Sequence, residues 1–468
     1  CKLVLPGVTW DYLRFVRGED GNGGHFQGWR PAAGTFDGWP KAAADLKILD
    51  PCCGSGHFLV AALHHLVPTR MVEEGLSARE AVDAVLRDNL HGLEIDERCC
   101  QIAAFALAFA AWTYADAGGY RPLPDMHIAC TGIGPQCSAE QWLKLAEQSG
   151  TPMPADRREA IKNGLLNLHR LFSQAPTLGS LINPSELPAD LITANYETIK
   201  PYLAAILKAE KADDETRERA IAAAGMVKAA DLLADDYTLV ITNVPYLGRG
   251  KQDEVLKAHI DDGYADGKAD LATVFVLRCL ELSADGGSAA IVTSQNWLFL
   301  TSFAGMRKSL LKHREWKVVV RLGEHAFQSP AAAGAFAALL VLGTSLPPED
   351  ALIAGIDVSA PRGQKPIYAD EKASLLRGQP AVDIVLVSQK DQSRNPEAAI
   401  TFEIVRGETR IGEIAYVGYG TKPGQTARVT RQFWEIKTTN SDYWIPMAST
   451  PDRSADYSGR TEVCLSIA

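Results

Sequence analysis

The 468-residue sequence predicts an α/β fold in which helices cover both faces of a mostly parallel sheet. The first observation behind this prediction is that short apolar runs of strand length alternate with longer segments of helical spacing. The second is a glycine-rich turn, PCCGSG, between one such run and one such segment. The third is a composition of 46% apolar and 22% charged residues, which is that of an ordinary globular protein.

The predicted elements of the first half follow one another in strand–helix order. Residues 46–50, LKILD, form an apolar run that ends on an acid, and the glycine turn leads into the helical pattern HFLVAALHHLV. Ser77 and Glu80 form a capping-box pattern, which predicts the start of a second helix. The half is completed by a strand at 90–96, an apolar helix at 99–115 and a short strand at 125–132.

Helical spacing dominates the middle of the chain, and strands return after it. A helix at 271–282 is predicted between two strands, and further strands follow, so the predicted strands are 237–243, 287–294, 316–322 and 337–343. The helix–strand rhythm stops near Pro347, so we expect a separate β-rich region from there. The expected organisation is an N-terminal segment (1–45), the first half of the sheet domain (46–136), a helical insertion (137–230), the second half (231–345) and a carboxyl-terminal region (346–468).

Composition and charge exclude several classes of protein. No stretch reaches the roughly 20 consecutive apolar residues of a membrane-spanning helix, and no secretory signal opens the chain, so we expect a cytoplasmic protein without a membrane partner. The net charge of -10 argues against non-specific coating of nucleic acid but allows a local basic cleft. The nine cysteines include no C-x-x-C pair, so we expect reduced thiols and no metal site. Because the sequence starts at Cys1 without an initiator methionine, we expect both ends to be cuts in a longer chain.

One segment, residues 307–321, is strongly basic, with six cations against the single acid Glu315. Two interpretations fit this pattern equally well. The segment is either a solvated helix face or a surface that faces phosphates. The cations are Arg307, Lys308, Lys312, Arg314, Lys317 and Arg321.

Ligands in an open α/β sheet bind beyond the carboxyl ends of the strands, and three predicted strand ends carry unusual residues. At the first, Gly54 and Gly56 let the backbone turn tightly and approach a ligand. Leu59 stands where a dinucleotide fingerprint has its third glycine, which disfavours a pyrophosphate cofactor. At the second, Glu94 can accept both hydroxyls of a ribose. Alone it would be a helix cap, but with the glycine turn it favours a nucleoside cofactor that carries a carboxylate, such as S-adenosylmethionine.

The third strand end reads TNVPY, which alone would be a plain turn. Beside the other two, it suggests a site for an exocyclic amino group of a nucleobase. The side-chain oxygen of Asn243 and the carbonyl of Val244 can accept the two N–H bonds of that group, which frees the nitrogen lone pair for a methyl donor. Pro245 biases Val244 to an extended conformation, and Tyr246 offers a ring on which an extruded base can stack.

Together, DPCCGSGHFL, LEID and NVPY resemble the motifs of the adenine-N6 DNA methyltransferases, in particular the Eco57I-like branch of restriction-modification and phage-defence systems. The resemblance covers roughly residues 46–136 and 235–345, and more weakly 411–437. It implies a Rossmann-like S-adenosylmethionine-dependent methyltransferase fold with a helical insertion and a C-terminal target-recognition region. It further implies methylation of adenine N6 in double-stranded DNA after base flipping, with restriction or phage-defence subunits as partners.

The resemblance also implies roles for individual residues. The predicted cofactor-binding residues are Asp50, Pro51, Gly54, Ser55, Gly56, Glu94 and Ile95, and the predicted catalytic residues are Asn243, Val244, Pro245 and Tyr246. Asp270 lies in a matching segment of unassigned role, and the loop 248–251 is either a phosphate contact or a flexible loop.

The chain departs from the family pattern in three ways. Val244 stands where the family usually has a second proline, and Thr131 stands where it has an acid that contacts the cofactor's adenine. The segment that closes over the cofactor is not recognisable in residues 1–45. Two other functions remain open: methylation of RNA adenine or protein glutamine, and a non-catalytic DNA-recognition subunit.

Overall fold

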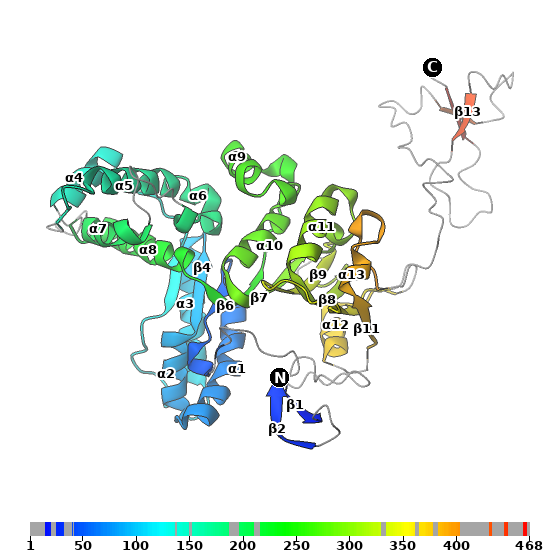
Figure 1. Cartoon of the computed structure of the whole chain (residues 1–468), viewed down its shortest axis with the longest axis horizontal. Helices are drawn as coiled ribbons and strands as arrows, with labels where there is room; N and C mark the ends of the chain where they lie inside the picture. Colours follow the sequence, from blue (N-terminus) through cyan, green and yellow to red (C-terminus); the bar gives the residue numbers. More distant parts are fainter. Residues whose placement is uncertain are drawn as a thin grey trace. The chain divides into compact units, whose positions relative to one another are not determined.

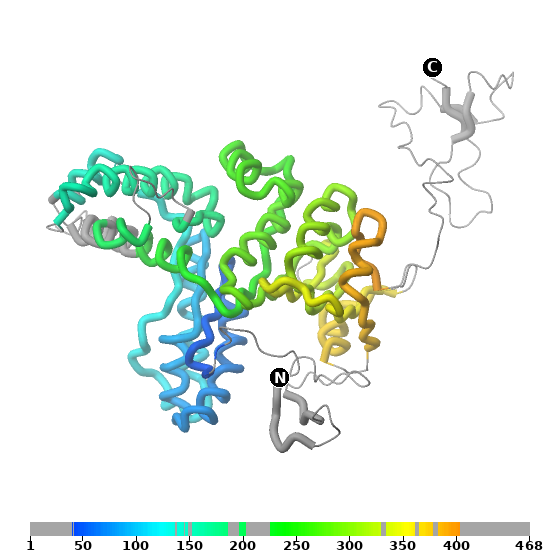
Figure 2. Tube along the Cα trace, viewed as in Figure 1, coloured from blue at the N-terminus to red at the C-terminus, as the bar shows by residue number. Residues whose placement is uncertain are grey.

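The computed structural model describes most of the chain between residues 40 and 402, and short strands outside that range (Figures 1 and 2). It divides into two units, Cys1–Ile404 and Val405–Ala468. The described residues are 40, 42–135, 138–148, 152–186, 196–209, 216–328, 334–360, 365–377, 382–402 and the strands β1 (Phe15–Glu19), β2 (His25–Pro31), β12 (Thr430–Gln432), β13 (Trp444–Met447) and β14 (Glu462–Leu465).

A nine-stranded mixed sheet forms the centre of the first unit, in the order β11-β10-β8-β9-β7-β6-β3-β4-β5. Five of its strand pairs are parallel, and β9 runs antiparallel to both β7 and β8. The predicted Rossmann-like α/β fold with a mostly parallel sheet is therefore confirmed. The strands are β3 (Ile48–Asp50), β4 (Leu90–Glu94), β5 (His127–Cys130), β6 (Tyr237–Asn243), β7 (Ser283–Ser294), β8 (Glu315–Gly323), β9 (Ala337–Gly343), β10 (Leu352–Asp357) and β11 (Ile384–Ser388).

Helices cover both faces of this sheet because successive strand residues point to opposite sides. In β3 and β4, Ile48 and Leu90 pack into a core with α1 (His57–Glu74), α2 (Ala78–Asp88) and α3 (Glu97–Thr113). Leu49 and Leu93 of the same strands pack on the other face. The core on that face also contains residues of the insertion, of α10 (Leu271–Glu281) and of α11 (Ala304–His313).

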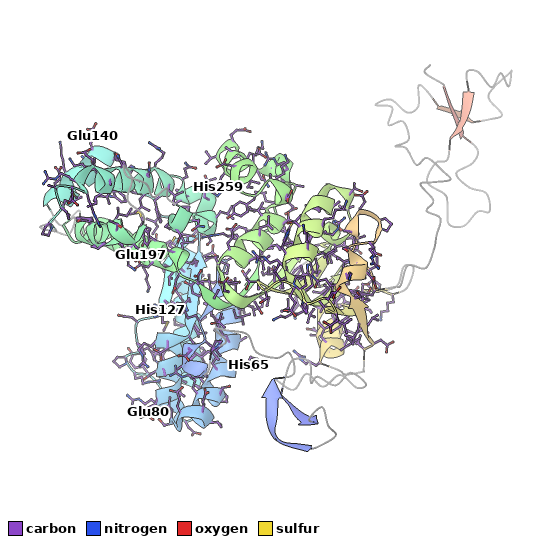
Figure 3. All side chains as sticks on the ribbon, in the orientation of Figure 1. His65, Glu80, His127, Glu140, Glu197 and His259 are labelled. Atoms are coloured by element: carbon purple, nitrogen blue, oxygen red, sulfur yellow. The ribbon has the colours of Figure 1, made fainter. Side chains whose placement is uncertain are left out.

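Local sequence signals start several of these helices. Ser77 and Glu80 form a complete capping box at the start of α2, as predicted. Glu80 is labelled in Figure 3. Asp96 caps α3 by accepting from the N–H of Arg98, and Asp270 caps α10 by accepting from the N–H of Ala272.

The residues between β5 and β6 form α4 (Ala139–Gln148), α5 (Arg158–Phe172), α6 (Ala175–Leu178), α7 (Tyr196–Ala209) and α8 (Thr216–Ala234). Their buried side chains, for example Phe172 and Leu181, belong to the same core as Val240 of β6 and Phe275 of α10. The helices of the insertion therefore share one hydrophobic core with the second half of the sheet domain. Among the described residues, no helix has the length and apolar character needed to cross a membrane.

The structure differs from the sequence expectation after Pro347. Instead of starting a separate region, the chain adds β10 parallel to β8 and β11 antiparallel to β10, so the sheet continues past the expected boundary at 346. The helix between these two strands, α12 (Ala369–Leu376), has only eight residues, so the helix–strand alternation is weak in this part of the sequence. In the second unit, β12, β14 and β13 form a three-stranded antiparallel sheet.

The basic segment 307–321 fits neither expected interpretation as a whole, because several of its cations hold the protein's own backbone. Arg307 is completely buried and donates to the carbonyls of Trp297, Leu300, Glu397 and Ala398. In the same way Arg314 donates to the Thr344 carbonyl and Arg321 to the Ile400 carbonyl, whereas Lys308 and Lys312 are exposed.

Candidate cofactor and target-base site

The order in which the chain adds strands to the sheet reverses between β3 and β6. The predicted site residues gather at this point. From β3 the chain proceeds to β4 and β5 on one side, then returns to form β6 on the other side of β3. The carboxyl ends of the two parallel strands, at Asp50 and Asn243, therefore border the same crevice. Crevices of this kind are the usual ligand sites of open α/β sheets.

The glycine turn after β3 has the backbone that the sequence predicts. Gly54 and Gly56 have φ angles of +50° and +82°, a region that residues with a side chain rarely adopt. A Cβ atom on Gly56 would also lie 3.1 Å from Ala103 of α3, so a side chain would push this helix away. Ser55 is on the turn, and its hydroxyl lies 2.9 Å from Nδ1 of His57.

Glu94, at the end of β4, organises the backbone around the turn. One carboxylate oxygen accepts from the N–H of Gly54 at 2.8 Å, and the other accepts from the N–H groups of Ile95 (2.8 Å) and Asp96 (3.1 Å). An ionised carboxylate has about four lone-pair positions, so it retains room for one further hydroxyl donor. Ile95 itself is 43% exposed.

Asp50, in contrast, is almost completely buried, and its pKa is raised above the usual value. Its Oδ1 accepts from the N–H of Cys52 at 3.1 Å. Burial raises the pKa of Asp50 to about 7, because a carboxylate loses its hydration inside the protein. The charge of this group therefore responds to pH in the neutral range.

The four residues of the predicted catalytic motif differ strongly in exposure. Val244 is buried, and its N–H donates to the Val292 carbonyl of β7 at 3.2 Å, which fixes the end of β6. Asn243, Pro245 and Tyr246 are exposed. Within the part of the chain that the structure describes, the Asn243 side-chain amide makes no hydrogen bond, so it is free to bind a ligand.

The loop that follows the motif is held by the start of α10. Asp270 accepts from the N–H of Leu247 at 3.3 Å, and Leu247 in turn accepts from the N–H of Leu271 at 3.0 Å. Arg249 pairs with Asp261 of α9 (Glu254–Gly263). Asp270, whose role the sequence left open, thus caps α10 and anchors this loop.

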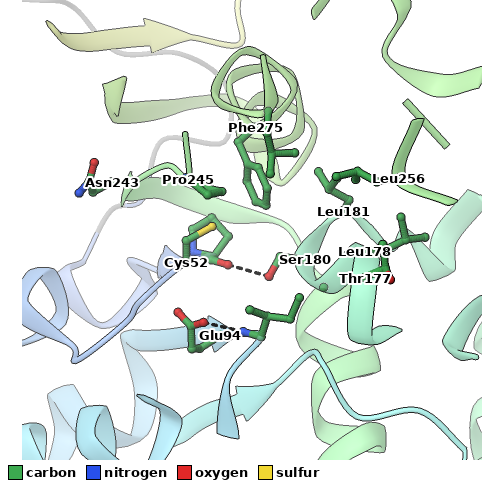
Figure 4. A pocket seen from close by; sticks show the side chains of 14 residues that line it. Cys52, Glu94, Thr177, Leu178, Ser180, Leu181, Asn243, Pro245, Leu256 and Phe275 are labelled. Carbon is green, nitrogen blue, oxygen red and sulfur yellow. Dashed lines mark hydrogen bonds between the residues drawn. The ribbon is translucent and has the colours of Figure 1, made fainter. Parts of the chain in front are cut away.

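One pocket of about 290 Å³ joins these strand ends (Figure 4). Of the predicted residues, Pro51, Glu94, Ile95, Asn243 and Pro245 line it. Asn243 lies at one edge of the group of labelled side chains, with Pro245 between it and Phe275 (Figure 4). The predicted residues outside the lining are Asp50, Gly54, Ser55, Gly56, Val244 and Tyr246.

The lining also contains residues that sequence reasoning missed. Leu271 and Phe275 lie one helical turn apart on α10, and this spacing in DLATVF is a signal that could have found them. No comparable signal marks the others, which are Cys52, Leu256 and residues 177–181 of the insertion. Thr131, which stands in place of the family's acid, is buried, and its hydroxyl lies 3.4 Å from that of Ser180.

Known proteins share long segments with this chain. The adenine-specific methyltransferase BrxX of Escherichia coli O9:H4 (strain HS) is 30% identical over 300 residues, which is 60% of this chain and 24% of that protein. The adenine-specific methyltransferase PglX of Lacticaseibacillus casei (strain Zhang) is 27% identical over 291 residues, 62% of this chain and 23% of that protein. The chain thus spans about a quarter of the length of these curated relatives.

Solved structures and family models also match. The Type IIL restriction-modification enzyme MmeI in complex with DNA has a TM-score of 0.44 at 12% identity, covering 90% of this chain and 45% of that one. The model of the MmeI DNA-methyltransferase domain matches residues 37–117. The model described as Eco57I restriction-modification methylase matches residues 88–327, more than half of the 468 residues. The chain belongs to the Eco57I restriction-modification methylase family.

Proposed function

We propose that the chain carries the cofactor-binding and catalytic parts of an enzyme that transfers a methyl group from S-adenosylmethionine to adenine N6 in double-stranded DNA. The observation that carries this proposal is the single pocket in which Glu94 and Ile95 face the same space as Asn243 and Pro245. Membership of a methylase family implies a methyl donor. The names of the relatives, adenine-specific methyltransferases, support adenine as the acceptor.

The residues of the pocket fit this methyl donor. A carboxylate with a free lone pair suits a ribose hydroxyl, and the apolar side chains of Ile95, Leu271 and Phe275 suit a purine ring. The glycine turn, with its Gly54 and Gly56 backbone, would hold the amino-acid end, with Asp50, Pro51 and Ser55 around it. When bound, S-adenosylmethionine supplies a methyl carbon attached to a positively charged sulfur.

The catalytic motif would act on the amino group of a flipped adenine. The Asn243 oxygen and the Val244 carbonyl accept the two N–H bonds, so the nitrogen lone pair is withdrawn from the ring and directed at the methyl carbon. S-adenosylmethionine held by Glu94 and the glycine turn would supply the methyl carbon, and its sulfur would retain the electron pair of the broken bond. Water would accept the proton that the methylated nitrogen releases. Pro245 fixes the backbone, and the exposed ring of Tyr246 stacks on the base.

The proposed setting follows from this reaction. Double-stranded DNA is the macromolecular substrate, the cytoplasm is the compartment, and a restriction activity is the expected partner function of a restriction-modification methylase. The region after residue 404, with its β12–β14 sheet, is proposed to belong to target recognition.

Methyl transfer with labelled S-adenosylmethionine tests the proposal. The full chain is incubated with duplex DNA, RNA or protein, and the products are digested to nucleosides or amino acids. We expect the label in N6-methyladenine from duplex DNA. Label in RNA adenine or protein glutamine would reassign the substrate, and cofactor binding without transfer to any acceptor would indicate a non-catalytic recognition subunit.

A further inference from the structure

Residues 177–181 of the insertion form one side of the pocket. They run from the end of α6 through the 3-10 turn η3 (Gly179–Leu181) and supply five of its 14 lining residues. The glycine turn and the catalytic motif supply two each. In Figure 4, Ser180 lies opposite Cys52, and Leu181 faces the same space as Phe275. We call residues 177–181 the insertion wall.

Ser180 fastens the insertion wall to the glycine turn. Its side chain is buried, and its hydroxyl donates to the carbonyl of Pro51 at 2.6 Å, across 129 positions of sequence. Without this acceptor the buried hydroxyl would be left with only the more distant Thr131 hydroxyl, 3.4 Å away, so the contact with Pro51 favours a fixed distance between the wall and the turn.

Gly179 brings the backbone of the wall onto Ile95. Its φ angle is +52°, and a Cβ atom there would lie 3.1 Å from Cδ1 and 3.3 Å from Cγ1 of Ile95. The wall therefore touches the residue that is proposed to pack on the cofactor's adenine. A displacement of the insertion wall would therefore change the space around Ile95.

Arg278 of α10 holds the wall from behind. Its side chain is 1% exposed, and Nε donates to the Ser180 carbonyl at 3.1 Å, while Nη2 donates to the Ile182 carbonyl at 2.8 Å and the Leu233 carbonyl at 3.4 Å. The same helix places Phe275 in the pocket one turn earlier. One helix thus sets both its own side of the pocket and the position of the insertion wall.

We propose that the insertion wall is an integral part of the cofactor site, and that Arg278 and Ser180 are the positioning residues that hold it against the glycine turn and Ile95. This inference rests on the proposed function, because the ligand concerned is S-adenosylmethionine. It makes cofactor affinity depend on a segment that lies outside the three motifs DPCCGSGHFL, LEID and NVPY.

Arg278→Lys tests the proposal, with Arg307→Lys as its matched control. Both arginines are buried and donate to several carbonyls, but those of Arg307 lie away from the pocket. Lysine keeps the charge but cannot reproduce the planar fork. We expect the dissociation constant for S-adenosylmethionine, measured by calorimetry on the full chain, to rise about tenfold or more in Arg278→Lys and to stay within about twofold in Arg307→Lys.

Ser180→Ala provides a milder second test if Arg278→Lys does not fold. Its control is Ser283→Ala, which removes another buried serine hydroxyl bonded to one carbonyl, that of Cys279 at 2.8 Å. We expect Ser180→Ala to raise KM for S-adenosylmethionine while kcat stays within about twofold, and Ser283→Ala to change neither.

Two results would overturn the inference alone: unchanged cofactor affinity in Ser180→Ala, or equal losses in each variant and its control, since a purely structural role predicts equality. A wild-type chain that binds no S-adenosylmethionine would instead overturn the proposed function. The two failures are therefore distinguishable.

Discussion

The two sides of the pocket, one at the ends of β3 and β4 and the other at the end of β6, differ in how many of their polar groups are already paired. Beside β3 and β4, the N–H groups of Gly54, Ile95 and Asp96 all donate to the carboxylate of Glu94. At the end of β6, Asn243 is exposed and makes no side-chain hydrogen bond within the described part of the chain. One side is organised before any ligand binds, and the other is open.

This difference matches the two ligands proposed for the pocket. A small cofactor gains affinity from a site that is already ordered, because little conformational entropy is lost on binding. A base extruded from a duplex must enter from outside, so the residues that receive it have to be accessible. We therefore expect variants on the ordered side to lose stability and cofactor affinity, and variants on the open side to lose turnover.

Asn243→Ala should give the largest effect and should separate the two sides most clearly. We expect the turnover number for methyl transfer to duplex DNA to fall about 10²-fold or more, since one of two acceptors for the amino group is lost. The unfolding free energy and the cofactor dissociation constant should stay nearly unchanged. Asn296→Ala, an exposed asparagine beyond the neighbouring strand β7, is the control. Retained turnover in Asn243→Ala would remove this residue from the mechanism.

Glu94→Gln, on the ordered side of the pocket, should lower both the stability of the protein and its affinity for the cofactor. A neutral amide has only one acceptor oxygen, so some of the N–H groups of Gly54, Ile95 and Asp96 lose their partner. We expect the unfolding free energy to fall by about 1–3 kcal/mol and the dissociation constant for S-adenosylmethionine to rise about tenfold. Denaturant unfolding and calorimetry measure the two, with the exposed Glu97→Gln as control. Intact cofactor binding would contradict the role given to Glu94.

Asp50→Asn should change how stability depends on pH. The pKa of Asp50 is raised from 3.8 to about 7, so between these values the folded chain holds a proton that the unfolded chain has released. The contribution of Asp50 to stability is therefore lost as pH rises from about 4 to 7. In Asp50→Asn this slope, at most about 1.4 kcal/mol per pH unit, should disappear. Denaturant unfolding at pH 5–8 checks it, against the exposed Asp45→Asn. An unchanged slope would mean that Asp50 titrates normally.

Val244→Pro should have the smallest effect. It restores the family's second proline but removes the N–H that donates to the Val292 carbonyl, so we expect stability to fall by about 1 kcal/mol. Because the Val244 carbonyl is kept, turnover should change by less than about fivefold. Paired unfolding and transfer assays measure this. A large loss of turnover would show that the amide of this residue, and not only its carbonyl, matters on the open side.

Much of the fold was predictable because its signals are local. Ser77 and Glu80 start α2 through a capping box, and Gly54 and Gly56 adopt the positive φ angles expected of a glycine turn. The continuation of the sheet beyond residue 346 was not predictable, because apolar runs such as LIAGID and IVLVS indicate strands but not which sheet they join, and only the pairing of β10 with β8 and of β11 with β10 decides that.

Part of the site was predictable for the same reason. Glu94, Ile95, Asn243 and Pro245 follow strand ends that the sequence marks clearly, and the structure places all four in one pocket. Arg307 shows the limit of such reasoning: its charge suggested a phosphate or a solvated surface, but it is buried among backbone carbonyls. A run of charged residues in the sequence does not indicate which of them are buried in the fold.

The sequence by itself determined the chemical groups at the three strand ends, because turns, caps and strand boundaries depend on neighbouring residues. Only the tertiary structure decided what encloses them. Residues 177–181 reach the pocket through contacts with Pro51 and Arg278, about a hundred positions or more away in the chain. Such contacts arise when separate helices and strands bury a common core, and no short stretch of sequence encodes them.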